Sequence, residues 1–157
     1  MRIGEIITAL EEWAPPALQE SYDNSGLIIG NSDWETQGVL VALDCLESVV
    51  DEAIEKKVQF IVAHHPIVFS GLKRFNGHTY IERVIMKAIK HNIAIYAIHT
   101  NLDNVLWGVN AKIMSLLGVT DHKVLSPMPA ALHQYQGDAP VMTRLPPAAR
   151  PLSPVSF

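Results

Sequence analysis

Apolar residues along this chain fall into blocks that alternate between the spacing of strands and the spacing of helices. Three near-continuous apolar runs, each bounded by turn residues, are typical of strands covered on both faces: 39–44, 59–63 and 93–98. Apolar positions three or four residues apart predict a helix after each of these strands: about 47–57, 81–89 and 109–117. This alternation predicts an α/β fold, a mostly parallel sheet with helices on both faces.

The first thirty residues add one more helix and one short strand to this pattern. Helical spacing over 3–10 predicts a helix, and Pro15-Pro16 end it. The turn residues 22–26 then precede a short strand, 27–29.

The composition changes sharply near the end of the chain. From Ser126 onward there are seven of the ten prolines, a single acidic residue (Asp138) and no periodic apolar segment. We therefore predict an N-terminal α/β metal-binding domain over 1–129, followed by a Pro-rich irregular tail over 130–157.

Overall charge and cysteine content restrict the class of protein. The net charge of −4 argues against a nucleic-acid partner, which normally requires a concentrated basic face. No apolar run approaches the roughly 20 residues of a membrane span, and acidic residues interrupt the N-terminal segment, so we expect a cytoplasmic protein without a membrane partner. The single cysteine, Cys45, excludes an intramolecular disulfide and a Cys-rich zinc site, and its neighbours predict a small buried apolar residue.

Polar side chains follow each of the three predicted parallel strands. The first strand ends in Asp44, the second runs into His64-His65, and the third leads to His99 and Asp103. Because the carboxyl ends of parallel strands meet at one edge of a sheet, these residues should lie close together. Imidazole and carboxylate without thiolate suit Zn, Mn, Fe, Co or Ni, with His64, His65 and Asp103 as the principal ligands.

Two arrangements of the adjacent histidines are compatible with the sequence. Neighbouring residues of a regular strand point to opposite faces, so both can serve one ion only if the backbone leaves the strand near Pro66. Alternatively, His64 and His65 each hold one ion of a metal pair about 3.5–4 Å apart.

Several of these residues also have structural interpretations. Asp103 and Asp44 could each cap the helix that follows them, and His99 could orient a ligand or contact substrate. The remaining histidines are interpreted as structural or surface residues: His78, His91, His122 and His133.

The loop 68–79 lies between two of the strands that carry these residues. It combines the aromatic residues Phe69 and Phe75 with the basic pair Lys73 and Arg74. Either it is a mobile lid with a basic contact for an anionic substrate, or it is a solvated surface loop.

Three motifs resemble one known family. Tyr-Asp-Asn-Ser-Gly-Leu at 22–27, Ala-His-His-Pro-Ile at 63–67 and His-Thr-Asn-Leu-Asp at 99–103 are similar to the NIF-three-like family, whose bacterial members are labelled GTP cyclohydrolase type-two homologues. The resemblance covers about residues 1–129. It implies a dinuclear metal centre in a two-part α/β protein that assembles into a toroidal hexamer.

By position, the resemblance implies that His64 and Asp103 bind one metal and His65 the other. The family completes this site with a His-x-x-x-Glu motif near its C-terminus. Here no histidine follows His133 and no glutamate follows Glu82. We therefore expect a truncated or frameshifted chain that lacks the second half of the family fold and binds metal weakly or in part.

Three functions follow from these observations. The first is a metal-dependent hydrolase of an anionic substrate, with nucleotides among the candidates. The alternatives are a non-catalytic metal-binding oligomeric protein that acts through partners, and a truncated fragment without a function of its own.

Overall fold

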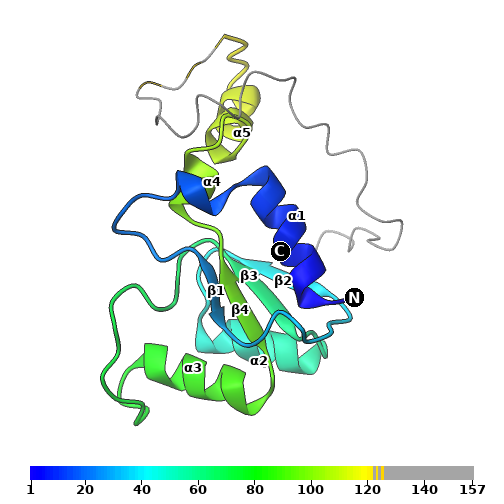
Figure 1. The fold of residues 1–157 in the computed structure, drawn as a ribbon, viewed down its shortest axis with the longest axis vertical. Helices are drawn as coiled ribbons and strands as arrows, with labels where there is room; N and C mark the ends of the chain where they lie inside the picture. The colour runs from blue at the N-terminus through cyan, green and yellow to red at the C-terminus, as the bar shows by residue number, and fades with distance from the viewer. Residues whose placement is uncertain (122, 124, 126–157) are drawn as a thin grey trace.

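The computed structural model describes residues 1–121, 123 and 125, so the predicted tail over 130–157 lies outside the described residues. Helices and strands alternate through most of this part of the chain (Figure 1). In order, the elements are α1 (Ile3–Trp13), η1 (Pro16–Leu18), β1 (Gly26–Ile29), β2 (Val39–Ala42), α2 (Glu47–Glu55), β3 (Phe60–Ala63), α3 (Tyr80–Lys90), β4 (Ala94–Ala97), α4 (Thr100–Asp103) and α5 (Val109–Leu116).

The strands form one four-stranded sheet in the order β1-β4-β3-β2. β2, β3 and β4 are parallel, whereas β1 pairs with β4 in the antiparallel direction. α1 covers one face of the sheet, and α2 and α3 cover the other (Figure 1). The predicted α/β class, with a mostly parallel sheet and helices on both faces, is confirmed.

The two central strands are buried on both sides, as their continuous apolar sequences predicted. Every residue of β3 and β4 is buried. Phe60 and Val62 pack with α1, whereas Ile61 and Ala63 pack with α2 and α3, because successive residues of a strand point to opposite faces. These strands therefore form a rigid centre whose carboxyl ends position the residues that follow.

The prediction that the first parallel strand is covered on both faces is wrong. β2 is an edge strand, and Val41 is 76% exposed. Its register with β3 places Val39 and Val41 on the same face as Phe60 and Val62. On that face α1, with η1 and α4, packs on the central strands, and the outward-facing Val39 and Val41 of β2 stay exposed.

The two short helical elements η1 and α4 were not predicted. A buried amide side chain joins α4 to the core. Asn101, within α4, is fully buried; its side chain donates to the Ala14 carbonyl oxygen (2.7 Å) and accepts from the His99 backbone N–H (2.9 Å). The last helix, α5, ends as predicted, with Gly118 following it at a φ of 74°. None of the residues of α5 is buried.

A reciprocal cap begins α3. The Thr79 hydroxyl oxygen accepts from the Glu82 backbone N–H, and the Glu82 carboxylate accepts from the backbone N–H groups of Asn76 and His78. Burial acts to raise the pKa of Glu82, but these hydrogen bonds outweigh it and hold the pKa below its usual value. The ionised carboxylate therefore stabilises the folded state.

We predict that Glu82→Gln lowers the stability of the protein at pH 7 and that the difference from wild type shrinks as the pH falls below about 4.5. A carboxyl group with a lowered folded-state pKa stabilises above its unfolded pKa and loses that contribution on protonation. Urea denaturation at pH 7, 4 and 3 measures it. Glu55→Gln, at an exposed position in α2, is the control and should change little at any pH.

Candidate metal centre

His64 and His65 follow β3 directly and converge on one site. β3 ends at Ala63, the chain bends at both histidines, and their ring centroids are 4.9 Å apart. Their backbone N–H groups still donate to the carbonyl oxygens of Ala42 and Leu43. The departure from regular strand geometry therefore allows adjacent histidines to share a site, as one of the two predicted arrangements required.

His99 enters the same cluster from the end of β4. Its ring centroid lies 5.3 Å from that of His64 and 5.6 Å from that of His65. One ligating nitrogen from each of the three rings lies within 4.8 Å of the others. The ends of β3 and β4 thus bring three imidazoles to one edge of the sheet, as the sequence predicted.

The Nδ1 atoms of His64 and His65 are both engaged by acceptors. His64 Nδ1 is 2.9 Å from the carbonyl oxygen of Ile98, and His65 Nδ1 is 2.7 Å from Oδ1 of Asp44. A carbonyl or carboxylate oxygen only accepts, so each Nδ1 carries the proton. The Nε2 of each neutral ring then keeps a free lone pair.

His99 is held in the same way by a buried carboxylate. Its Nδ1 donates to Oδ1 of Asp23 at 2.8 Å, and the Asp23 side chain is fully buried. Oδ2 of Asp23 also accepts from the Thr100 backbone N–H, the Thr100 hydroxyl and the Ser25 hydroxyl. Burial acts to raise the pKa of Asp23, but the hydrogen bonds from Thr100, His99, Ser25 and Asn24 outweigh it and hold the pKa far below its usual value.

Asp103 and Asp44 are not helix caps. Asp103 ends α4, and α5 begins after Gly108, whereas the cap position of α2 is Leu46 without a side-chain cap. Asp103 Oδ1 lies 3.9 Å from Nε2 of His64, and its carboxylate makes no hydrogen bond within the described residues. Asp44 instead holds the His65 ring.

The other candidate residues are not members of the cluster. Lys73 and Arg74 are exposed, and within residues 1–121 neither makes a hydrogen bond or ion pair. Cys45 is buried, and burial raises the pKa of its thiol to about 12, which fits the predicted small apolar role. Both remaining histidines in the described part of the chain, His78 and His91, are exposed; His122 and His133 lie outside it.

Asp23 is the site residue that the sequence did not reveal. We expected site residues only after the parallel strands, but β1 is antiparallel, with Gly26 paired to Ala97. The turn before β1 therefore lies beside the residues after β4. The sequence signal for it was the polar turn 22–26, which becomes informative once the direction of β1 is known.

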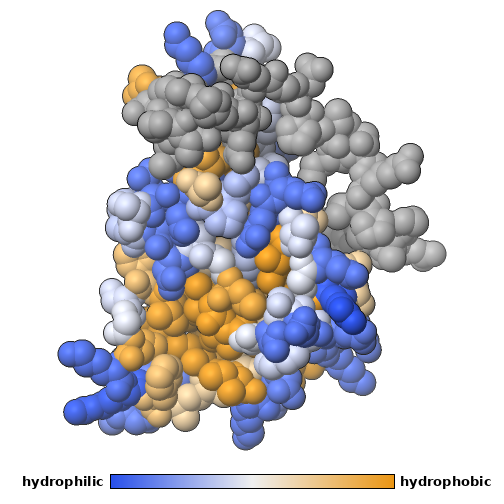
Figure 2. Space-filling view, viewed as in Figure 1, coloured by the Kyte–Doolittle hydropathy of each residue, from blue (hydrophilic) through white to orange (hydrophobic). Residues whose placement is uncertain are grey.

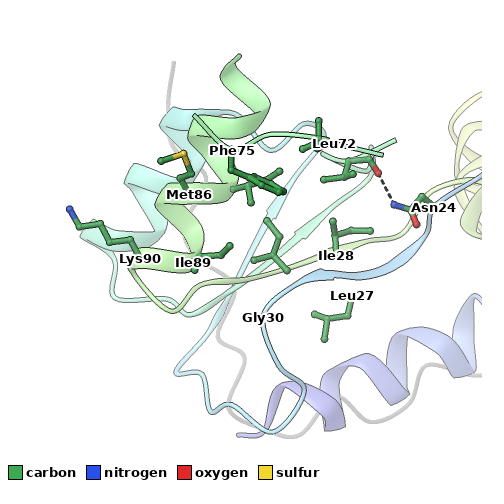
Figure 3. A pocket seen from close by; sticks show the side chains of 12 residues that line it. Asn24, Leu27, Ile28, Gly30, Leu72, Phe75, Met86, Ile89 and Lys90 are labelled. Atoms are coloured by element: carbon green, nitrogen blue, oxygen red, sulfur yellow. Dashed lines mark hydrogen bonds between the residues drawn. The ribbon is translucent and has the colours of Figure 1, made fainter. Parts of the chain in front are cut away.

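The described part of the chain also has an apolar groove, and it does not contain the histidine cluster. Figure 2 shows apolar side chains gathered over β1 and α3. Leu27 and Ile28 line the groove from β1, and Met86 and Ile89 from α3 (Figure 3). At one end of the groove Asn24 donates to the carbonyl oxygen of Val68 at 2.7 Å, so the groove ends beside the turn that holds His99.

Fold and site together define an α/β protein with an imidazole cluster, able to hold metal, at the carboxyl edge of its sheet. The chain belongs to the Duf34/NIF3 (NGG1p interacting factor 3) family, whose model matches residues 1–147. The family resemblance of the three motifs is therefore confirmed. Among the residues that the structure describes, every helix falls short of the length and apolar character that a membrane span requires.

Known relatives match most of this chain and a smaller part of their own length. A protein of Halalkalibacterium halodurans named GTP cyclohydrolase 1 type 2 homolog is 46% identical over 78% of this chain and 33% of its own. The crystal structure of a Bacillus cereus protein related to NIF3 is 41% identical, with a TM-score of 0.77, over 82% and 36% of the two chains. Reduced HcgD from Methanocaldococcus jannaschii is 33% identical, with a TM-score of 0.74, over 80% and 50%. The chain thus spans between a third and a half of the length of these relatives.

We predict that Asp23→Asn destabilises the protein by about 1–3 kcal/mol, because an amide in place of the buried carboxylate leaves one of its hydrogen-bond donors unpaired. Urea denaturation at pH 7 measures the free energy of unfolding. Asp33→Asn, at an exposed carboxylate, is the matched control. Equal stability of the two variants would contradict this role of Asp23.

Proposed function

We propose that this chain binds divalent metal through His64, His65 and Asp103, and that the metal-bound protein is a hydrolase for an anionic substrate. The observation that carries the proposal is the convergence of three imidazoles whose Nδ1 atoms are all taken by acceptors, which leaves the Nε2 atoms available to a ligand. Metal-binding histidines are oriented in this way by carboxylate or carbonyl partners.

The donor set fits a transition metal. It consists of imidazole nitrogen and carboxylate oxygen, and the thiol of Cys45 is buried with a raised pKa. Such donors suit Zn, Mn, Fe, Co or Ni. Asp103 supplies negative charge beside His64, and its carboxylate is available because no hydrogen bond within the described residues occupies it. One ion or a pair fits a cluster of this width.

His99 is assigned a different role, that of general base. Its partner Asp23 is a fully buried, ionised carboxylate, which stabilises the imidazolium that forms when Nε2 accepts a proton. Asp44, the corresponding partner of His65, has a side chain 53% exposed, so water weakens its effect on the ring. A bound divalent cation supplies Lewis-acid activation of water and attraction for an anionic group.

Nucleotides are the substrate class to test first. The relatives that match this chain are named GTP cyclohydrolase 1 type 2 homologs, which supports GTP as a candidate. Lys73 and Arg74 contact none of the cluster residues by hydrogen bond or ion pair, so we assign anion binding to the metal and not to the loop. The hexamer, the second metal and the cytoplasmic location stay predictions.

A non-catalytic metal-binding protein that acts through partners is the second candidate. The apolar groove between β1 and α3 favours it, because contiguous exposed apolar surface marks interaction sites. Metal binding without turnover of any nucleotide would support this candidate over the hydrolase.

We predict that protein purified without chelator contains metal and that His64→Ala/His65→Ala loses it, because the double variant removes two of the three proposed ligands. Elemental analysis per chain measures this. His78→Ala/His91→Ala removes two exposed histidines outside the cluster and should keep the wild-type metal content. Equal metal in both double variants would rule the site out.

We also predict that His99→Gln keeps the metal but lowers the rate of nucleotide hydrolysis by a factor of about 100 to 10,000, the usual contribution of a general base. Metal content and turnover are measured on the same preparation, with His91→Gln as the control. Loss of metal in His99→Gln would instead make His99 a ligand.

A further inference from the structure

Two exposed aromatic side chains stand beside His99. Phe69 is 52% exposed and Tyr22 is 65% exposed. Their ring centroids are 6.4 Å apart at an interplanar angle of 52°. The Phe69 ring is also 6.4 Å from the His99 ring and nearly perpendicular to it, at 88°. The two aromatic rings therefore form a pair that directly adjoins the proposed general base.

Hydrogen bonds of neighbouring residues hold this pair in place. Tyr22 precedes Asp23, whose carboxylate binds His99. Phe69 follows Val68, whose carbonyl oxygen accepts from the Asn24 side chain at 2.7 Å (Figure 3). The turn before β1 and the loop after β3 are thus joined to each other and to the histidine cluster. This arrangement pre-positions both rings, which lowers the entropic cost of binding a ligand there.

The exposure of both rings points to a ligand. Keeping large apolar surface in water is unfavourable, although a single exposed aromatic residue is common on protein surfaces. Here two such rings lie against one another, and one of them, Phe69, also lies against His99 at the edge of a candidate active site. Aromatic pairs of this kind bind flat rings by stacking, as they do in nucleic-acid-binding proteins.

We infer that Tyr22 and Phe69 form a stacking subsite for the base of a nucleoside phosphate, whose phosphate lies toward His64 and His65. This inference rests on the proposed function, since it assigns the subsite to the substrate of the same centre. The apolar groove offers no equivalent pair of rings, because Phe75 is the single aromatic residue among the described residues that line it. Stacking on Phe69 determines the preference for substrates that carry an aromatic base.

The test compares AMP and GMP with ribose 5-phosphate, which has the sugar phosphate without the base. Isothermal titration calorimetry of zinc-loaded protein should give Kd values about tenfold or more lower for AMP and GMP. Phe69→Ala and Tyr22→Ala should each remove at least about a fivefold part of this preference and leave ribose 5-phosphate binding unchanged. Phe75→Ala, which removes a similarly exposed ring from the same loop, is the matched control and should change neither affinity.

The failure of the subsite is distinguishable from the failure of the metal centre. Stacking involves no metal, so the preference for AMP and GMP should persist in chelated protein while all affinities fall. Zinc-loaded wild type that binds ribose 5-phosphate as tightly as GMP would overturn the subsite and leave the metal centre intact. A dimer in sedimentation that Phe69→Ala dissociates would also overturn it, because the rings would then be an interface between copies.

Discussion

The junction made by the buried carboxylate of Asp23 determines how the candidate site is assembled. It joins the turn before β1 to His99 and to the first residue of α4 through a set of charge-assisted hydrogen bonds. Because β1 is antiparallel to β4, this turn meets the carboxyl ends of the parallel strands. Without that contact His99 would have no oriented partner, and Tyr22 would not lie beside Phe69. The position of β1 in the sheet therefore places the one side chain, Asp23, that orients the proposed base His99.

Most of the fold followed from the apolar pattern, because the pattern reports which faces are buried. The central strands and α3 were predicted closely, since their burial agrees with their local sequence preference. The coverage of β2 was not predicted, because Val39 and Val41 look the same in a central strand as in an edge strand. Whether an apolar strand face is covered depends on where a distant helix packs, and α1 packs on the central strands.

The site was predictable to the extent that it follows the parallel strands. His64, His65 and His99 converge as expected, and Asp44 and Asp103 lie beside them. Asp23 was missed because its contribution depends on strand direction, and a four-residue strand gives no local sign of direction. The contact of Phe69 with His99 was likewise invisible in the sequence, because it depends on the path of a loop fixed by the Asn24–Val68 hydrogen bond.

The three imidazoles differ in what orients them, and this difference has a consequence for protein engineering. His65 and His99 are held by the side chains of Asp44 and Asp23, whereas His64 is held by the main-chain carbonyl of Ile98. Replacing an aspartate can retune the basicity of two of the rings independently. The orientation of His64 does not depend on the side chain at position 98, because every amino acid there presents the same main-chain carbonyl. Directed evolution of this centre would therefore vary two adjustable imidazoles, the proposed ligand His65 and the proposed base His99, around a third, His64, whose partner stays constant.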